Sequence, residues 1–343
     1  MIKVVLDAFG GDNAPECTIE GTLEAINLKN DLHVVLVGDE NRINELLAGR
    51  EYNKEQISIV HATEVISNNE SPTVAIRQKQ DSTIVKGFNY LKENEDAVAF
   101  VSCGSTGAVL TGGFMKLGRI KGVSRPACCP VLPTKNGGIV AMCDSGANVE
   151  CDSKNLVHFA IMANAYIKNT YGIENPRIAL LNVGTEDHKG DALRKETFET
   201  LKNMKGLNFV GNMEARDLLS GDYDIVVCDG FSGNVLLKST EGAISSLLSM
   251  LKAGIKKSFL SKIGYLFMRK TFKELKKTMD YNNHGGAVLL GCKKLVVKGH
   301  GGSKYTSIRE CILQAYNMHK AGVVEKLEKG IIEFNESQTQ VEE

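Results

Sequence analysis

Short apolar runs alternate with amphipathic stretches along most of the chain, and polar loops separate them. The apolar runs are continuous, which is typical of strands that are buried on both faces of a parallel sheet. The repeated order of strand, loop and helix predicts an α/β protein, an αβα sandwich with a mostly parallel sheet. The seven expected strands fall in residues 2–6, 33–37, 96–101, 138–143, 177–183, 223–228 and 294–297.

One compact domain is expected over residues 1–334, because no linker rich in proline, glycine or serine interrupts the pattern. This domain includes a basic amphipathic segment at 252–277. Residues 123–138 contain three prolines and are expected to form an excursion or an edge of the sheet. The polar residues 335–343 read as a disordered tail.

Five of the loops that follow the strands are rich in glycine, asparagine, aspartate or hydroxyl residues. A turn followed by a helix cap explains any one of them alone. In an open parallel sheet, however, ligands bind where the carboxyl ends of the strands meet, so we expect these loops to line a shared pocket. Glycine lets backbone N–H groups approach an anion, and SCGSTGA (102–108) and DGFSGN (229–234) are the best candidates to hold phosphate.

Several common motifs are missing from the 343 residues. The chain has no P-loop, and no G-x-G-x-x-G follows the first strand, so neither a nucleotide triphosphatase nor a standard dinucleotide site is indicated. G-x-S-x-G and H-E-x-x-H are also missing. The nine cysteines form no C-x-x-C pair, which favours reduced thiols over disulfides or a zinc site. We expect no metal and no organic cofactor.

The candidate catalytic residues lie in these loops. In GTEDHKGD, His188 and Lys189 would place an imidazole and an ammonium in the pocket, although solvated surface residues are the alternative. Cys103 and Cys228 lie beside the glycine loops and are either nucleophiles or, more commonly, small buried residues. No secretory signal and no run of about 18 apolar residues is evident, so a cytoplasmic protein is expected.

Net charge is zero, but residues 252–277 contain nine Lys/Arg and one acid, Glu274. We expect this segment to form two short helices that divide near Gly264, with an apolar stripe beside the cations. Such a surface suits anionic lipid headgroups, whereas the alternative is a core helix with a solvated basic face. The stripe consists of Ile255, Phe259, Ile263, Leu266 and Phe267.

Six stretches taken together resemble the PlsX family of bacterial phosphate acyltransferases, from about Ile2 to about Gly330. They are DAFGGDNAP, SCGSTGA, DSGANVECD, LLNVGTEDHKGD, DGFSGNVLLKSTEG and GGAVLLG…KGHGGS, in that order. Each motif is weak alone, but the ordered set is highly specific. The chain departs from the family pattern of Met, Asn, Val and Glu at Phe9, Ser105, Ser145 and Thr185.

The resemblance implies a fold related to isocitrate and isopropylmalate dehydrogenases, a homodimer, and peripheral association with the inner face of the cell membrane. The implied reaction converts long-chain acyl-acyl carrier protein and inorganic phosphate to acyl phosphate and free carrier protein, in phospholipid synthesis. A glycerol-3-phosphate acyltransferase would act downstream, and no nucleic acid is expected as a partner. Acidic carrier protein is also a candidate to dock on the basic segment.

The resemblance also implies site residues. Lys189 is expected to neutralise charge, and Asn234 to act as an oriented donor. Asp7 and Asp12 are expected to orient neighbouring donors, because two carboxylates beside a phosphate would repel it. The expected substrate-binding residues are Asp7, Gly10, Gly11, Asp12, Gly104, Ser105, Thr106, Gly107, Asn148, His188, Asp229, Ser232, Gly233 and His300.

Two other functions remain open at this point. One is a dehydrogenase of the related fold, which would need a nicotinamide cofactor and usually a metal held by carboxylates such as Asp7, Asp144 and Asp229. The other is an adaptor at the membrane surface that binds acyl carrier protein without chemistry, but a docking module does not need five converging loops.

Overall fold

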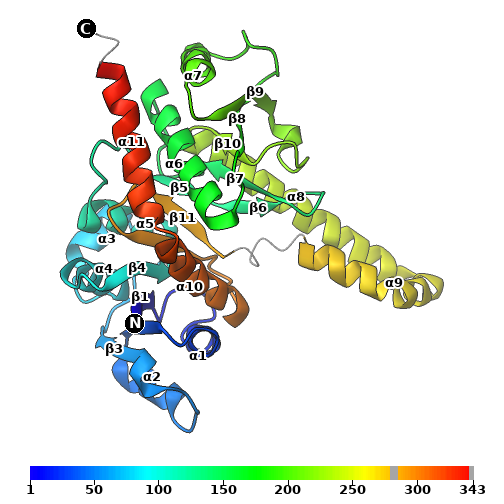
Figure 1. Cartoon of the computed structure of the whole chain (residues 1–343). Helices are drawn as coiled ribbons and strands as arrows, with labels where there is room; N and C mark the ends of the chain where they lie inside the picture. Colours follow the sequence, from blue (N-terminus) through cyan, green and yellow to red (C-terminus); the bar gives the residue numbers. More distant parts are fainter. Residues whose placement is uncertain (279–284, 340–343) are drawn as a thin grey trace.

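The computed structural model describes residues 1–278 and 285–339 and contains two sheets (Figure 1). The first sheet combines four strands from the first 102 residues with β5 (Ala127–Cys129) and two strands from beyond residue 285. Its order is β3 (Ile57–His61), β2 (Leu32–Gly38), β1 (Ile2–Asp7), β4 (Ala97–Ser102), β12 (Leu295–Lys298), β11 (Ala287–Leu290) and β5 (Ala127–Cys129).

The second sheet contains five strands from the middle of the chain. Their order is β6 (Val131–Pro133), β7 (Ile139–Cys143), β10 (Ile225–Val227), β8 (Arg177–Asn182) and β9 (Asn208–Glu214). Among the described strands, antiparallel pairing is confined to pairs that involve β5, β6 or β11. The prediction of an α/β protein with mostly parallel strands is therefore confirmed, although the strands form two sheets where one was expected.

The stretch at 123–138 makes the crossing between the sheets. β5 is the edge strand of the first sheet and β6 is the edge strand of the second, with Pro130 between them. Proline donates no backbone hydrogen bond, so it is tolerated at such an edge. The expectation of an edge in this stretch is confirmed.

Helices cover both sheets, and one buried apolar cluster includes side chains from each of them, for example Leu6 and Ile178. α6 contributes Phe159 to this cluster, and α10 and α11 contribute Ile312 and Ile331. That residues 1–334 form a single domain stays a prediction. The helices are α1 (Glu16–Leu28), α2 (Glu40–Leu47), α3 (Pro72–Gln78), α4 (Thr83–Glu93), α5 (Thr106–Gly112), α6 (Ser153–Tyr171), α7 (Ala192–Asn203), α8 (Gly230–Lys257), α9 (Phe259–Thr278), α10 (Tyr305–Lys320) and α11 (Val323–Thr339).

Helices α8 and α9 form a hairpin that extends away from the body (Figure 1). The chain reverses at Ser258, which has extended backbone angles and accepts a hydrogen bond from Ser261 N at 3.5 Å. The expected division at Gly264 is wrong, since α9 continues through it. The division falls at Ser258 because its side chain caps the start of α9. A glycine inside a helix, such as Gly264, is tolerated at modest cost and does not have to end it.

The boundary predicted at residue 335 is also wrong, because α11 continues to Thr339. Phe334 is buried, and Asn335 Nδ2 donates to Gly122 O at 3.3 Å, which holds this end of the helix against the body. Residues 340–343 of the expected tail lie outside the described residues.

Candidate functional site

Three loops of the first sheet meet where β1, β4 and β12 end. Asp12 N donates to Gly301 O at 2.8 Å, which joins the first loop to the last. A side chain at Gly10 would lie 2.8 Å from Gly104 N, so the glycine is required by close packing of two loops. Gly11 has φ +108°, a conformation that favours glycine. Asp12 is exposed on this loop.

Asp7 is buried at the centre of these loops. It accepts hydrogen bonds from Ser102 Oγ at 2.7 Å and from Phe9 N at 3.2 Å. Ser102 Oγ in turn accepts from Gly104 N at 3.0 Å. Burial raises the pKa of Asp7, and the bond from Ser102 opposes that rise. The carboxylate therefore holds the loops in place and points its oxygens at protein donors.

A second buried carboxylate, Asp144, organises the loop after β7. It accepts hydrogen bonds from four backbone N–H groups, of which Asn148 N is the shortest at 2.6 Å. Asn148 Nδ2 donates to Asp144 Oδ2 at 3.0 Å and to Pro126 O at 2.7 Å. The amide nitrogen of the predicted ligand Asn148 is thus occupied by protein acceptors.

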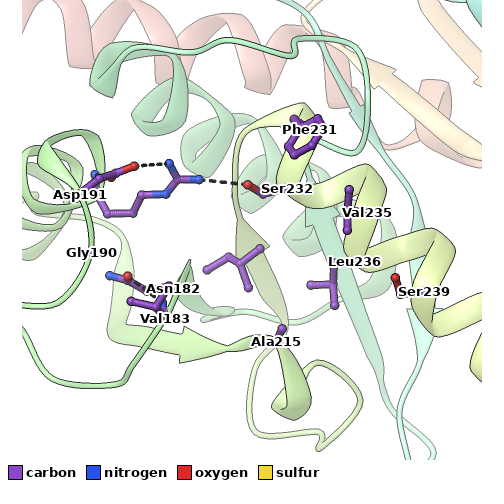
Figure 2. A pocket seen from close by; sticks show the side chains of 12 residues that line it. Asn182, Val183, Gly190, Asp191, Ala215, Phe231, Ser232, Val235, Leu236 and Ser239 are labelled. Carbon is purple, nitrogen blue, oxygen red and sulfur yellow. Dashed lines mark hydrogen bonds and ion pairs between the residues drawn. The ribbon is translucent and has the colours of Figure 1, made fainter.

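Asp229 begins α8 and was expected to contact substrate. Its carboxylate accepts from Ser232 N and from Ser232 Oγ, both at 2.8 Å, and pairs with Arg194. Arg194 also donates to Asp191 Oδ2 at 2.9 Å and to Ser232 Oγ at 3.2 Å, in the region drawn in Figure 2. Asp229 is therefore a helix cap, the alternative that the sequence left open for this loop, and its arginine partner was not foreseen.

A cavity of about 710 Å³ lies beside this arginine. Figure 2 shows Phe231, Val235 and Leu236 projecting from α8 on one side, opposite Asn182 and Val183 at the end of β8. Its remaining lining residues are Leu181, Gly190, Asp191, Arg194, Ala215, Ser232 and Ser239. The wall that α8 contributes is mainly apolar.

A second cavity, of about 230 Å³, lies along another side of the same helix. The positions on α8 that line it differ from those that line the first cavity, so the first turns of the helix form a wall between the two. Among its lining residues are Thr106, Ser145, Asn234, Lys298 and His300. The structure thus brings three of the predicted site residues, Thr106, Asn234 and His300, to one small polar cavity.

Lys298 is the residue that the sequence analysis missed. It is the last residue of β12 and is only 7% exposed. Its Nζ donates to Gly299 O. Burial lowers the pKa of this lysine. The available signal was a cation at the carboxyl end of an apolar strand, two residues before the predicted His300.

The other predicted loop residues take different positions. His188 is exposed, and Lys189 Nζ lies 4.0 Å from Glu186 Oε1 in the loop between β8 and α7. Neither His188 nor Lys189 is among the residues that line the two cavities. A side chain at Gly233 would lie 1.9 Å from Asp144 O, so this glycine permits the close approach of α8 to the loop after β7.

Two of the departures from the family pattern lie in this region. Ser105 is buried at the start of α5 and its side chain makes no capping hydrogen bond. Ser145 lines the polar cavity, and its Oγ donates to Cys128 O at 3.0 Å.

Gly107, a predicted site residue, packs against Pro72, since a side chain there would lie 2.5 Å from Pro72 Cγ.

Cys103 and Cys228 are both buried thiols. Burial raises the pKa of each, and Cys228 Sγ donates to Asp144 O at 3.1 Å. A raised pKa favours the neutral thiol, which is a poor nucleophile. Among the described residues there is no group of three or more histidines, cysteines and carboxylates arranged to hold a metal ion.

Comparison with known proteins gives a consistent result. Residues 2–326 match the model of a family described as fatty acid synthesis protein. The chain is 44% identical to a phosphate acyltransferase from Clostridium novyi (strain NT) over 96% of this chain and 98% of that protein. It is also 44% identical to a phosphate acyltransferase from Thermoanaerobacter pseudethanolicus, over 96% of this chain and 97% of that protein.

Two solved structures share the fold. A phosphotransacetylase from Streptococcus pyogenes superimposes with a TM-score of 0.61 at 16% identity, covering 93% of this chain and 94% of that chain. A branched-chain phosphotransacylase from Enterococcus faecalis V583 gives a TM-score of 0.55 at 14% identity, covering 93% of this chain and 100% of that chain.

Proposed function

Because the chain belongs to the fatty acid synthesis protein family and is a phosphate acyltransferase, we propose that its acyl donor is long-chain acyl-acyl carrier protein. A phosphate oxygen attacks the thioester carbonyl, a new C–O bond forms, and the C–S bond breaks. The products are acyl phosphate and the free thiol of the carrier protein, which takes up a proton. In this proposal the reaction serves bacterial phospholipid synthesis.

The observation that carries the proposal is the pair of cavities on α8. The cavity of about 710 Å³ has an apolar helix wall suited to an acyl chain, and the cavity of about 230 Å³ has the polar groups suited to an anion. A thioester carbonyl that lies near the start of α8 is within reach of both.

Catalysis in this proposal depends on orientation and on charge stabilisation. Phosphate is already ionised near neutral pH, so no strong general base is needed. Asn234, on the wall of the polar cavity, would donate to the oxyanion that develops on the carbonyl oxygen. Lys189 would neutralise charge from the loop after β8. The other predicted loop residues would shape the site around the two substrates.

Purified protein is expected to form acyl phosphate from acyl-acyl carrier protein and inorganic phosphate, without added metal or nucleotide. The measurement is direct detection of acyl phosphate together with release of free carrier-protein thiol. Turnover that stops when a bound metal is stripped would contradict this expectation. Reduction of NAD or NADP, without acyl transfer, would instead support the dehydrogenase alternative.

The α8–α9 hairpin supports peripheral membrane association. Phe259 is 76% exposed and Phe267 is 84% exposed, and Ile263 and Leu266 are exposed beside them. These exposures favour the membrane proposal over the core-helix alternative, and Ile255, the fifth residue of the stripe, is half-buried. Within the described residues, no helix is long and apolar enough to cross a membrane. We infer that the hairpin lies on the inner face of the cell membrane, with its cations at anionic headgroups.

Replacing Ile263, Leu266 and Phe267 by polar residues tests this without changing any charge. Binding to phosphatidylglycerol vesicles is expected to be lost, while acyl transfer in solution is retained. The matched control replaces three exposed apolar residues of the body, Leu28, Val65 and Val74, by the same polar residues. Unchanged vesicle binding of the hairpin variant would refute the membrane proposal. Docking of acyl carrier protein would then be the remaining role for the cations of the hairpin.

Homodimer formation also belongs to the proposal, as does delivery of acyl phosphate to a downstream glycerol-3-phosphate acyltransferase. Light scattering at several protein concentrations measures the first of these. A monomer throughout the range would contradict it.

A further inference from the structure

We propose that Lys298 binds the inorganic phosphate, and that the cavity of about 230 Å³ beside it is the phosphate site. The inference rests on the proposed function, since it assigns the phosphate of that reaction to a particular cation. It differs from the expectation that Lys189 supplies the positive charge.

The first argument is the missing counter-ion of Lys298. Its side chain is buried, and within the described part of the chain it forms no ion pair. The ammonium has three donors, and the one hydrogen bond found for it goes to Gly299 O. A buried ammonium without an ion-pair partner is costly, and an anion bound from solution would offset that cost and keep the lysine charged.

The nearest candidates for an internal counter-ion are already engaged. Asp7 is a buried carboxylate whose charge acts on Lys298, but within the described structure the two form no ion pair. Asp7 instead accepts hydrogen bonds from Ser102 Oγ and Phe9 N. Glu241 is the single carboxylate among the described residues that line the cavity, and it pairs with Lys238 at 2.7 Å. These two charges cancel, so Lys298 supplies the remaining positive charge among the described residues that line the cavity.

The second argument is the chemistry of the rest of the cavity. Asn234 and Thr106 are neutral groups that can donate hydrogen bonds to phosphate oxygens, and both line the cavity. Its volume is far above the 10–15 Å³ or so that one water needs, so a tetrahedral oxyanion has room. Asn234 belongs to the helix wall shared with the apolar cavity, which puts the phosphate beside the acyl carbonyl.

Lys189 makes an instructive contrast. Its side chain is 42% exposed, and Glu186 lies 4.0 Å away. A solvated lysine with an acidic neighbour attracts phosphate far less than a buried lysine without one, because water and the carboxylate screen its charge.

The test is Lys298→Met, which removes the charge and keeps an unbranched side chain. The control is Lys293→Met, which makes the same change at an exposed lysine in the turn before β12. Inorganic phosphate is titrated against each protein, with chloride at equal ionic strength as reference, and binding is measured by calorimetry and by the rise in Tm. The KM for phosphate and the KM for acyl-acyl carrier protein are then measured separately.

We expect Lys298→Met to weaken phosphate binding and to raise the KM for phosphate by at least tenfold, with an unchanged KM for the acyl donor. Lys293→Met should match the wild type. Lys298→Gln, which keeps a polar end without charge, should show the same loss and replaces the methionine variant if that one does not fold. Wild-type phosphate affinity in a folded, neutral variant overturns the inference.

Failure of the proposed function is a separate result. If no acyl phosphate forms but phosphate binding depends on Lys298, the site assignment stands and the acyl donor is wrong. If acyl phosphate forms with an unaltered KM for phosphate in Lys298→Met, the reaction stands and the site assignment is overturned.

Discussion

Arg194 lines the first cavity on α8 and Lys298 lines the second, and these two cations differ in their partners. Arg194 beside the apolar cavity pairs with Asp191 and Asp229, so its charge is already balanced by the protein. Lys298 beside the polar cavity has a carbonyl oxygen as its acceptor. The comparison teaches that a cation in the lining of a cavity indicates a ligand only when the chain has left it without an ion-pair partner.

The largest expected effect is a loss of transfer activity when a residue that lines the polar cavity is replaced. Asn234→Ala removes a donor to the developing oxyanion and is expected to lower kcat by about 10²–10³. Lys189→Ala is expected to lose activity as well if Lys189 neutralises charge during the transfer, whereas retained activity would leave Lys298 as the cation of the site. Steady-state kinetics of acyl transfer measure both, and Asn44→Ala, an exposed asparagine on α2, is the control. Full activity of Asn234→Ala would remove it from the mechanism.

The next largest effect is a loss of stability when Arg194, which lines the apolar cavity, is replaced. Arg194→Met leaves Asp229, a 6% exposed residue, without its cation, and is expected to lower the free energy of unfolding by about 3 kcal/mol. Urea unfolding measures this, and Arg216→Met, an exposed arginine, is the control. Because Asp229→Asn removes the orphaned charge, the double variant should recover part of the loss.

An unaltered free energy of unfolding combined with a weaker affinity for phosphate would contradict this assignment. Arg194 would then be a ligand contact, and the contrast between the two cavities would disappear.

The smallest expected effect concerns the thiols. Cys103→Ala and Cys228→Ala should keep most of the transfer activity, because direct attack by phosphate needs no cysteine nucleophile. Rates and mass spectrometry of the acylated protein are the measurements. A trapped acyl-cysteine would make one of these thiols the nucleophile and would replace direct attack with a two-step transfer.

Local features of the fold could be predicted from the sequence because they depend on neighbouring residues. The strand that ends at Asp7 and the loop that follows it are readable from an apolar run and two glycines. The edge at 123–138 is readable from its prolines. Ser258 was missed because a serine cap and a flexible glycine give competing signals within a few residues.

The pairings between distant residues could not be predicted in this way. β12 pairs with β4 across nearly two hundred residues, and this pairing places Lys298 opposite Ser102 in the core. In the sequence alone, Lys298 is one lysine among many. The pairing of Arg194 with Asp229 is likewise a tertiary contact, so the sequence offered a helix cap or a ligand residue at Asp229 but not its arginine partner.

One continuous helix connects the proposed reaction site to the hairpin turn. From Asn234 to Ser258 the rise is about 36 Å at 1.5 Å per residue, and α8 runs without interruption over residues 230–257. A continuous helix of this length is expected to tilt as one rigid unit, so the tilt of the hairpin sets the orientation of the start of α8. If α8 lies flat on a bilayer, the start of the helix lies close to the headgroups and the product leaves directly into lipid. If it stands upright, the product must travel roughly 36 Å along the helix before it meets the membrane.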